Sequence, residues 1–296
     1  MLTLVTPGGD GRAAVSRAES GAVSVQLDDN HPGVADPAYR ARRDAIASLA
    51  VDWRPPDPVP HVAYTELEHE TWRTVCRELS GLWRTSAAAS FLSAAERLQL
   101  PTDHVPQLAE VSARLDPLTG FTYLPVAGLA PLRTFYSAFG DGVFWSTQYL
   151  RHHSKPLYTP EPDLCHEVLG HANQLADPAF AALYHAVAEA AARVESPEAL
   201  SLLSRIFWFT IEFGVVRERG ELRAYGAGLL SSFGEMKAFH DAELRPVDWT
   251  AMGTQSYDIT RYQQVLYEAP SLAWLFDEFR AFLDGFDDEA YLRMRP

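Results

Sequence analysis

The chain has 296 residues, 47% of them hydrophobic, which is enough apolar side chain for one large core and leads us to expect a single domain. Its formal net charge is −14 and no basic run stands out, so we expect no nucleic-acid or membrane partner and favour a small molecule instead. It contains no apolar run of about 20 residues that could span a bilayer, no secretory signal and only two cysteines, a pattern that favours a cytoplasmic location.

The first part of the chain has the composition of a tail. Residues 1 to about 24 are rich in Gly, Ala and Ser and show no hydrophobic periodicity. Such a segment buries too little apolar surface to offset the entropy of ordering it, so we expect a mobile tail over residues 1–24. Residues 25–296 are then expected to form the single domain.

Beyond the tail the chain is typical of helices. Apolar residues in 65–84 recur at mostly helical spacing, with Glu and Arg on the other face, and Phe180, Leu183, Val187 and Val194 mark another amphipathic helix. The first five expected helices cover 37–50, 65–84, 87–98, 106–114 and 131–138. Only VRERGELRAYG, residues 216–226, has the glycine turn between short extended runs that predicts a hairpin. The sequence therefore predicts a mainly α-helical single domain with few short strands.

Residues 158–171, YTPEPDLCHEVLGH, place two histidines five residues apart, His166 and His171. Zinc proteases of the H-E-x-x-H type place their two histidines four residues apart, on one face of a helix. At roughly 100° per residue, five residues turn the side chains about 140° apart, too far for one ion on a regular α-helix. We therefore expect a helix that starts after Asp163 as N-cap and presents His166, ends or loosens before His171, most easily by a break at Gly170, and then presents His171.

A carboxylate follows in an unusual setting. Residues 202–216, LLSRIFWFTIEFGVV, are mostly apolar, and the only charged residues among them are Arg205 and Glu212. A buried carboxylate costs several kcal/mol unless it is paired or binds a metal. Glu212 could pair with Arg205 or another arginine. It could instead join the two histidines in a two-histidine, one-carboxylate site, which suits ferrous iron with open positions for oxygen, with zinc as the alternative metal.

At this point the sequence resembles the catalytic domain of the pterin-dependent aromatic amino acid hydroxylases. The matching stretches are YTPEPDLCHEVLGH, VAGLAPLRTF, STQYLRHHSKP, FWFTIEFG and AYGAGLLSSFGE, in the family's order and spacing from about residue 30 to about residue 285. The resemblance implies a helical basket with few short strands and a single catalytic domain over 25–296. It also implies a monooxygenase that uses Fe(II), tetrahydrobiopterin or a related tetrahydropterin, and O2 to hydroxylate the ring of a free aromatic amino acid.

The resemblance assigns the metal and pterin residues. His166, His171 and Glu212 become the iron ligands. Glu167 would face the pterin and act in catalysis, although an acid favoured by the helix dipole is the other interpretation. The residues that the resemblance assigns to the pterin are Gly128, Ala130, Leu132, Phe135, Glu167 and Phe207, with the ring of Phe135 stacked on it.

The resemblance also assigns the amino acid site. Arg151 would bind the substrate carboxylate with two parallel donors, and Asp163 would orient it. Ser231 would support a ligand histidine and act in catalysis, whereas Glu235 is open between a functional and a structural role. The residues assigned to the substrate are Trp145, Arg151, Tyr158, Thr159, Pro162, Asp163, Trp208, Ser231 and Ile259.

Departures from the family pattern bear on substrate choice. Phe207 stands where phenylalanine hydroxylases tend to carry tyrosine, and Trp145 where they carry histidine and tryptophan hydroxylases carry tyrosine. Ile259 resembles tryptophan hydroxylases, whereas Trp208 resembles phenylalanine hydroxylases. Such changes are worth only about 1–3 kcal/mol each.

We expect L-phenylalanine as the substrate, with tyrosine or meta-tyrosine as the product. A tryptophan hydroxylase is the alternative within the family, and a zinc-dependent hydrolase is the alternative from another class. Larger members of the family add a regulatory domain and a coiled-coil tail, neither of which is recognisable here, so we expect a monomer.

Overall fold

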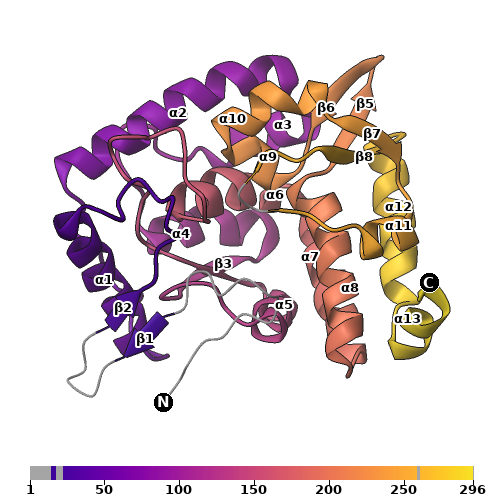
Figure 1. Cartoon of the computed structure of the whole chain (residues 1–296), viewed down its shortest axis with the longest axis horizontal. Coiled ribbons are helices and arrows are strands. Elements are labelled where there is room, and N and C mark those ends of the chain that lie inside the picture. The colour runs from indigo at the N-terminus through magenta and orange to yellow at the C-terminus, as the bar shows by residue number, and fades with distance from the viewer. Residues whose placement is uncertain (1–14, 18–22, 259–260, 296) are drawn as a thin grey trace.

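Helices make up most of the computed structural model, which describes residues 15–17, 23–258 and 261–295 (Figure 1). All five helices expected first are present with ends shifted by a few residues, which confirms the prediction of a mainly α-helical fold. The α-helices are α1 Pro37–Asp52, α2 Glu66–Ser86, α3 Ala89–Leu98, α4 Leu108–Thr119, α5 Leu132–Gly140, α6 Asn173–Leu175, α7 Pro178–Arg193, α8 Pro197–Phe207, α9 Ala227–Ser231, α10 Phe233–Ala238, α11 Trp249–Thr254, α12 Leu272–Asp284 and α13 Asp288–Met294. Two π-helices, η1 His166–Ala172 and η2 Trp208–Glu212, and the 3₁₀-helix η3 Phe239–Asp241 complete them.

The helices begin where the sequence supplies caps. Thr65 accepts a hydrogen bond from the backbone of Glu68 and Glu68 bonds back to Thr65, a capping box that fixes the start of α2. Asp177 caps α7, and the proline after it has a preset φ suited to the first helical turn. In α2, Trp72, Val75 and Leu79 are buried as their spacing predicted, but Leu67 is exposed.

Short strands form three small sheets. The strands are β1 Val15–Arg17, β2 Val23–Val25, β3 Thr122–Pro125, β4 Val143–Ser146, β5 Val215–Glu218, β6 Glu221–Ala224, β7 Glu243–Pro246 and β8 Val265–Ala269. β3 and β4 pair in parallel, and the largest sheet has the order β6-β5-β8-β7. β5 and β6 form the predicted hairpin, whose two turn residues, Arg219 and Gly220, both have positive φ as its tight turn requires.

The expected tail is partly wrong. β1 and β2 pair antiparallel, and Val15, Val23 and Val25 are buried against α1 and against Ala127. β1 and β2 are three residues long and contain one and two valines respectively, too little alternation to stand out among Ala and Ser. Residues 1–14 and 18–22 lie outside the described part of the chain.

The core is arranged around α7. This helix packs against α5 and α12, and the face predicted from Phe180, Leu183 and Val187 is buried. In Figure 1, α7 and α8 are drawn below α6, and α2 crosses the top of the view. No helix within the described ranges is long and apolar enough to cross a membrane.

Candidate metal centre and active site

The two histidines come from one continuous helix, so the expected break at Gly170 is wrong, whereas a loosening of the helix between them agrees with the structure. Residues 166–172 form the π-helix η1, and the chain is helical through Gly170 rather than broken there. A π-helix closes its turns with i→i+5 hydrogen bonds, so side chains five residues apart project from nearly the same side. The five-residue spacing that excluded a regular α-helix is therefore the spacing that a π-helix brings onto one face.

The ends and neighbours of η1 explain its residues. The Asp163 carboxylate accepts a hydrogen bond from the backbone N–H of His166 at 3.2 Å, which confirms Asp163 as the N-cap. A Cβ on Gly170 would lie 2.6 Å from the backbone oxygen of Ala227, the first residue of α9. Gly170 is thus required because α9 approaches closely, and not because the helix stops.

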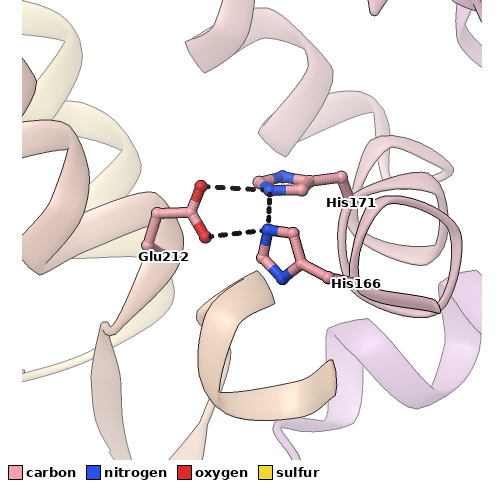
Figure 2. A group of neighbouring side chains, drawn as sticks. All are labelled: His166, His171 and Glu212. Carbon is pink, nitrogen blue, oxygen red and sulfur yellow. Dashed lines mark hydrogen bonds and ion pairs between the residues drawn. The ribbon is translucent and has the colours of Figure 1, made fainter. Parts of the chain in front are cut away.

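The carboxylate of Glu212 lies against both imidazoles (Figure 2). It is at the end of η2, where Oε1 lies 3.0 Å from Nε2 of His171 and Oε2 lies 3.7 Å from Nε2 of His166. The two Nε2 atoms are 3.1 Å apart. Arg205 instead donates to the backbone oxygen of Gly253, so the alternative of an Arg205–Glu212 pair is wrong.

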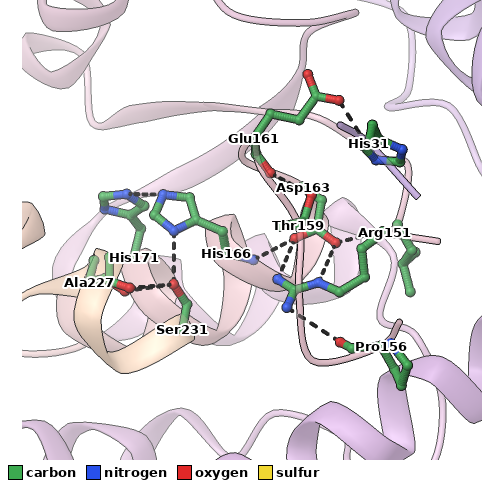
Figure 3. Close-up of polar contacts among 12 residues, drawn as sticks. His31, Arg151, Pro156, Thr159, Glu161, Asp163, His166, His171, Ala227 and Ser231 are labelled. Atoms are coloured by element: carbon green, nitrogen blue, oxygen red, sulfur yellow. Dashed lines mark hydrogen bonds and ion pairs between the residues drawn. The ribbon is translucent and has the colours of Figure 1, made fainter. Parts of the chain in front are cut away.

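Hydrogen bonds on the far side of each ring fix its tautomer. Ser231 Oγ donates to the backbone oxygen of Ala227 and lies 2.8 Å from Nδ1 of His166, so it accepts the proton of that nitrogen (Figure 3). Likewise the Tyr184 hydroxyl donates to Gln174 and lies 2.6 Å from Nδ1 of His171. Both rings therefore carry their proton on Nδ1 and direct an Nε2 lone pair at Glu212.

The electrostatics of the three groups match a cation site. Burial lowers the pKa of His166 to about 4, so this imidazole is neutral. Burial alone would raise the pKa of Glu212, but His171 and His166, which attract the carboxylate when they are protonated at low pH, outweigh burial and lower that pKa. The carboxylate is therefore already ionised where the imidazoles are neutral. Oε2 of Glu212 is buried without a hydrogen-bond partner among the described residues.

Three hydrogen-bond acceptors, Nε2 of His166, Nε2 of His171 and the carboxylate of Glu212, thus converge without a donor between them. All three ligand atoms lie within 4.8 Å of one another. Two neutral imidazoles and one carboxylate are the donor set of ferrous sites that keep positions open. The residues present therefore fit a divalent iron ion.

A cavity of about 330 Å³ opens beside the three ligands. The residues predicted to contact the pterin all line it: Gly128, Ala130, Leu132, Phe135, Glu167 and Phe207. So do most of those predicted to contact the substrate: Trp145, Arg151, Tyr158, Thr159, Pro162, Trp208 and Ser231. Asp163 lies behind Arg151, and Ile259 lies outside the described residues.

Arg151 and Asp163 form a buried pair at the cavity wall (Figure 3). Nε and Nη2 of Arg151 donate to the two carboxylate oxygens of Asp163 at 2.9 and 2.7 Å, and the backbone N–H of Arg151 adds a third bond at 2.7 Å. Burial alone would raise the pKa of Asp163, but Arg151 outweighs it and lowers that pKa. The guanidinium is thereby held in one orientation.

Two buried acids face the cavity without a cation within hydrogen-bond distance in the described ranges. Burial, with the charges of Glu212 and Asp163, raises the pKa of Glu167 well above its ordinary value, which favours the protonated form. Burial raises the pKa of Glu235 to about 7, and Glu235 accepts a hydrogen bond from the backbone of Gln263. Glu235, left open by the sequence, thus belongs to the cavity wall.

Tyr184 and Gln174 were not found from the sequence. Tyr184 lies within the predicted amphipathic helix but was not singled out, and Gln174 lies beyond the histidine motif. Both polar side chains lie in segments whose other residues are mostly apolar and buried. Because buried polar groups need hydrogen-bond partners, this setting was the signal that could have identified them.

Comparison with known proteins identifies the family. The family model described as biopterin-dependent aromatic amino acid hydroxylase matches residues 17–296. The chain belongs to this hydroxylase family. It is 50% identical over 260 residues to the phenylalanine 3-hydroxylase of Streptomyces coeruleorubidus, which covers 88% of this chain and 93% of that protein.

Two further relatives of the hydroxylase support the same assignment. It is 41% identical over 264 residues to the phenylalanine-4-hydroxylase of Rattus norvegicus, covering 87% of this chain but only 58% of that longer protein. The solved phenylalanine hydroxylase of Chromobacterium violaceum with bound iron(III) and 7,8-dihydrobiopterin has a TM-score of 0.70 and 29% identity, covering 76% of this chain and 86% of that one.

The hydroxylase is therefore an iron- and pterin-dependent monooxygenase that acts on an aromatic amino acid. Its cofactors are Fe(II) and a tetrahydropterin, with O2 as co-substrate. These findings confirm the family, fold and cofactors expected from the motifs. They give no support to the alternative function, a zinc-dependent hydrolase.

Proposed function

We propose that this hydroxylase converts L-phenylalanine to meta-tyrosine. The observation that carries the proposal is its 50% identity, over 93% of the relative's length, to a phenylalanine 3-hydroxylase, against 41% to a phenylalanine-4-hydroxylase. A buried arginine, an aromatic wall and three metal-ligand side chains around one cavity support an amino acid with an apolar ring as the substrate.

The carboxylate of the substrate is assigned to Arg151. Its guanidinium is oriented by Asp163 through two charge-assisted hydrogen bonds, so little side-chain freedom is lost when a second carboxylate binds. Thr159 and Pro162 line the cavity in the same loop and would contact the amino acid backbone and ring. The Thr159 hydroxyl is held by a bond to the backbone oxygen of Glu161.

The ring of the substrate would lie against Trp208. This indole stacks on Tyr257 with ring centroids 4.2 Å apart and donates its N–H to Gln263 at 3.1 Å, so its plane is fixed. Trp145 and Phe207 would bound the other sides and, with Trp208, exclude water from the reacting ring. A fixed slot selects the ring carbon that faces the metal, and we assign that carbon as C3.

The pterin is assigned to the side of the cavity formed by Phe135, Leu132 and Glu167. The residues there fit a flat, amide-bearing heterocycle because an aromatic face lies in one cavity with the carboxyl group of Glu167. The raised pKa of Glu167 favours the form that can both donate and accept hydrogen bonds. Bound ferrous iron and tetrahydropterin together supply the activation of O2 and two electrons. The chain itself binds, orients and shields the reactants.

The test is product identification with the iron-loaded protein. Phenylalanine, tyrosine and tryptophan would each be supplied with O2 and a tetrahydropterin, and products separated by ring position. We expect meta-tyrosine from phenylalanine, and none when the pterin is omitted. Para-tyrosine as the sole product would overturn the ring position, and faster turnover of tryptophan would overturn the substrate.

We propose that the chain acts as a monomer in the cytoplasm, with small molecules as its partners and no nucleic acid or membrane. The two cysteines, both free and buried, are compatible with a reducing compartment. Size-exclusion chromatography with light scattering at several protein concentrations tests the monomer.

A further inference from the structure

A buried hydrogen-bond chain connects the second histidine ligand to two other segments of the active site. Nδ1 of His171 lies 2.6 Å from the Tyr184 hydroxyl, which lies 2.6 Å from Oε1 of Gln174. Nε2 of Gln174 donates to the backbone oxygens of Ile211 at 3.1 Å and of Tyr225 at 2.9 Å. Gln174, Tyr184 and His171 are each at most 1% exposed, so water does not compete for these bonds.

The direction of every bond in this chain is determined. The amide nitrogen of Gln174 faces two carbonyl oxygens, and a reversed amide would place its oxygen against both, so Oε1 must face Tyr184. An amide oxygen only accepts, and a tyrosine hydroxyl has one proton, so Tyr184 donates to Gln174. The hydroxyl can then only accept from His171, which places that proton on Nδ1 and leaves Nε2 to bind metal.

The same amide also connects the segment that carries Glu212 with the segment that leads into α9. Ile211 directly precedes the ligand Glu212 on η2. Tyr225 lies two residues before α9, which carries the Ser231 that holds His166. Ser231, in contrast, passes its proton to Ala227 within its own helix. Gln174, in the helix α6 that continues η1, thus links both ligand-bearing segments, η1 and η2, to the chain just before α9. Among the described residues, Ser231 bonds only to His166 and within its own helix.

We propose that Tyr184 and Gln174 are positioning residues that fix the metal-binding tautomer of His171 and the place of Glu212, and so set the affinity of the site for ferrous iron. The proposal rests on the assignment of His166, His171 and Glu212 as the ligands. Hydrogen-bond partners behind a ligand imidazole typically change metal affinity about 10–100-fold when they are removed. Tyr184 and Gln174 carry that role for His171.

The decisive variant is Tyr184→Phe, which removes one hydroxyl and keeps the ring that packs against Phe139 and Phe207. Fe(II) affinity is measured by anaerobic titration of the metal-free protein, and we expect it to fall about 10–100-fold. Gln174→Met, which removes the amide bonds at similar volume, should lower it at least as much. The matched control is Tyr225→Phe, because the buried Tyr225 hydroxyl has no hydrogen-bond partner in the described structure and its loss should change affinity less than twofold.

A spectroscopic measurement separates this role from general packing. In the cobalt(II)-loaded protein each ligand imidazole gives a shifted ring N–H signal in the proton NMR spectrum. Tyr184→Phe should abolish or rapidly exchange the signal of His171 and leave that of His166. Both signals unchanged, with affinity within twofold of the parent, would overturn the proposal while leaving the ligand assignment intact.

Two measurements on the unchanged protein test the proposal even if the variants do not fold. Nitrogen-15 correlation spectra of the unchanged metal-free protein report the tautomer of His171 directly; the Nδ1–H form is expected, and the Nε2–H form would overturn the proposal. If the unchanged protein bound no Fe(II) or Co(II) at one ion per chain, the ligand assignment itself would fail, and this inference with it.

Discussion

At the scale of single residues, the ligand groups are acceptors that repel one another until a cation lies between them. The lone pairs of His166 and His171 and the carboxylate of Glu212 meet within hydrogen-bond distances, and each proton that could relieve the contact is engaged elsewhere. Such an arrangement destabilises the metal-free protein and favours the bound state. Metal binding should therefore raise thermal stability as well as enable turnover.

We expect Glu212→Ala to abolish iron-dependent turnover. The variant removes the only anionic ligand, so the two imidazoles remain as neutral donors that hold a divalent ion weakly. Turnover and bound iron per chain are the measurements. His185→Ala is the control, since His185 packs beside Phe121 away from the ligands and should retain activity; full activity in Glu212→Ala would contradict the ligand set.

Glu235 should make stability depend on pH. Burial raises its pKa from 4.5 to about 7 in the folded state, so below pH 4.5 the group is protonated in both states and costs nothing. As pH rises from 4.5 to 7 the unfolded chain releases the proton first, and stability falls by up to about 3 kcal/mol. Glu235→Gln removes this loss and keeps an acceptor for Gln263.

The measurement for Glu235 is urea unfolding of the metal-free protein between pH 4.5 and 8. Glu235→Gln should become more stable than the parent as pH rises, with the difference levelling above pH 7. Glu278→Gln, on the exposed side of α12, controls for the loss of one charge. A difference that is constant across this range would show that Glu235 titrates normally.

At the scale of elements, the two π-helices present the ligands. η1 places two histidines five residues apart on one side, and η2 continues directly from α8 and ends at Glu212. Each loses the closer packing of an α-helix, so both need support from neighbouring elements. α9 supplies it, because it packs on η1 at Gly170 and carries Ser231.

Gly170→Ala should therefore separate α9 from η1. The new methyl group would lie 2.6 Å from the oxygen of Ala227, which is backbone and cannot rotate away. We expect a loss of about 1–3 kcal/mol in unfolding free energy from overpacking, and weaker iron binding because Ser231 moves from His166. Chemical denaturation and iron titration measure the two effects.

Gly140→Ala is the matched control for Gly170→Ala. Gly140 ends α5, and a Cβ there would meet Ala188 at an ordinary 3.6 Å. Alanine is favoured over glycine in helices, so this variant should be neutral or stabilised by up to about 1 kcal/mol. Equal destabilisation of both variants would show that close approach to α9 is not the reason for Gly170.

At the scale of the whole molecule, the sequence was sufficient for what local patterns encode and insufficient for what packing decides. The ligand types, the N-cap at Asp163 and the β5–β6 hairpin follow from side-chain chemistry and short-range geometry. The π-helix at His166 does not, because it is stabilised by contacts with α9 rather than by its own residues. Glu212 could be separated from Arg205 only when the fold sent that arginine to Gly253.

The N-terminal part of the molecule also supports the active site from a distance. Arg43 of α1 is 2% exposed and lies 3.0 Å from the carboxylate of Glu161, which belongs to the loop between Thr159 and Asp163. The guanidinium is also held over the ring of Tyr149 at 3.7 Å. α1 is thus fixed to the loop that forms one wall of the cavity.

Arg43→Met should leave Glu161 as a buried carboxylate without its cation. Removing one partner of a buried ion pair typically costs about 3–5 kcal/mol, and here the cost falls on the loop that carries Thr159 and Pro162. We expect lower stability and a KM for the amino acid that rises more than kcat falls, because the loop positions substrate and the metal ligands lie elsewhere. Denaturant unfolding and steady-state kinetics measure both.

The double variant Arg43→Met, Glu161→Leu tests this cause. Replacing both members of a buried pair by apolar groups is often close to neutral, so most of the stability should return. If the loss came only from the packing of Arg43 on Tyr149, the second substitution would recover nothing. Recovered stability together with a persistently high KM would mean that the charged pair is needed to hold the loop in its substrate-binding position, beyond its contribution to folding.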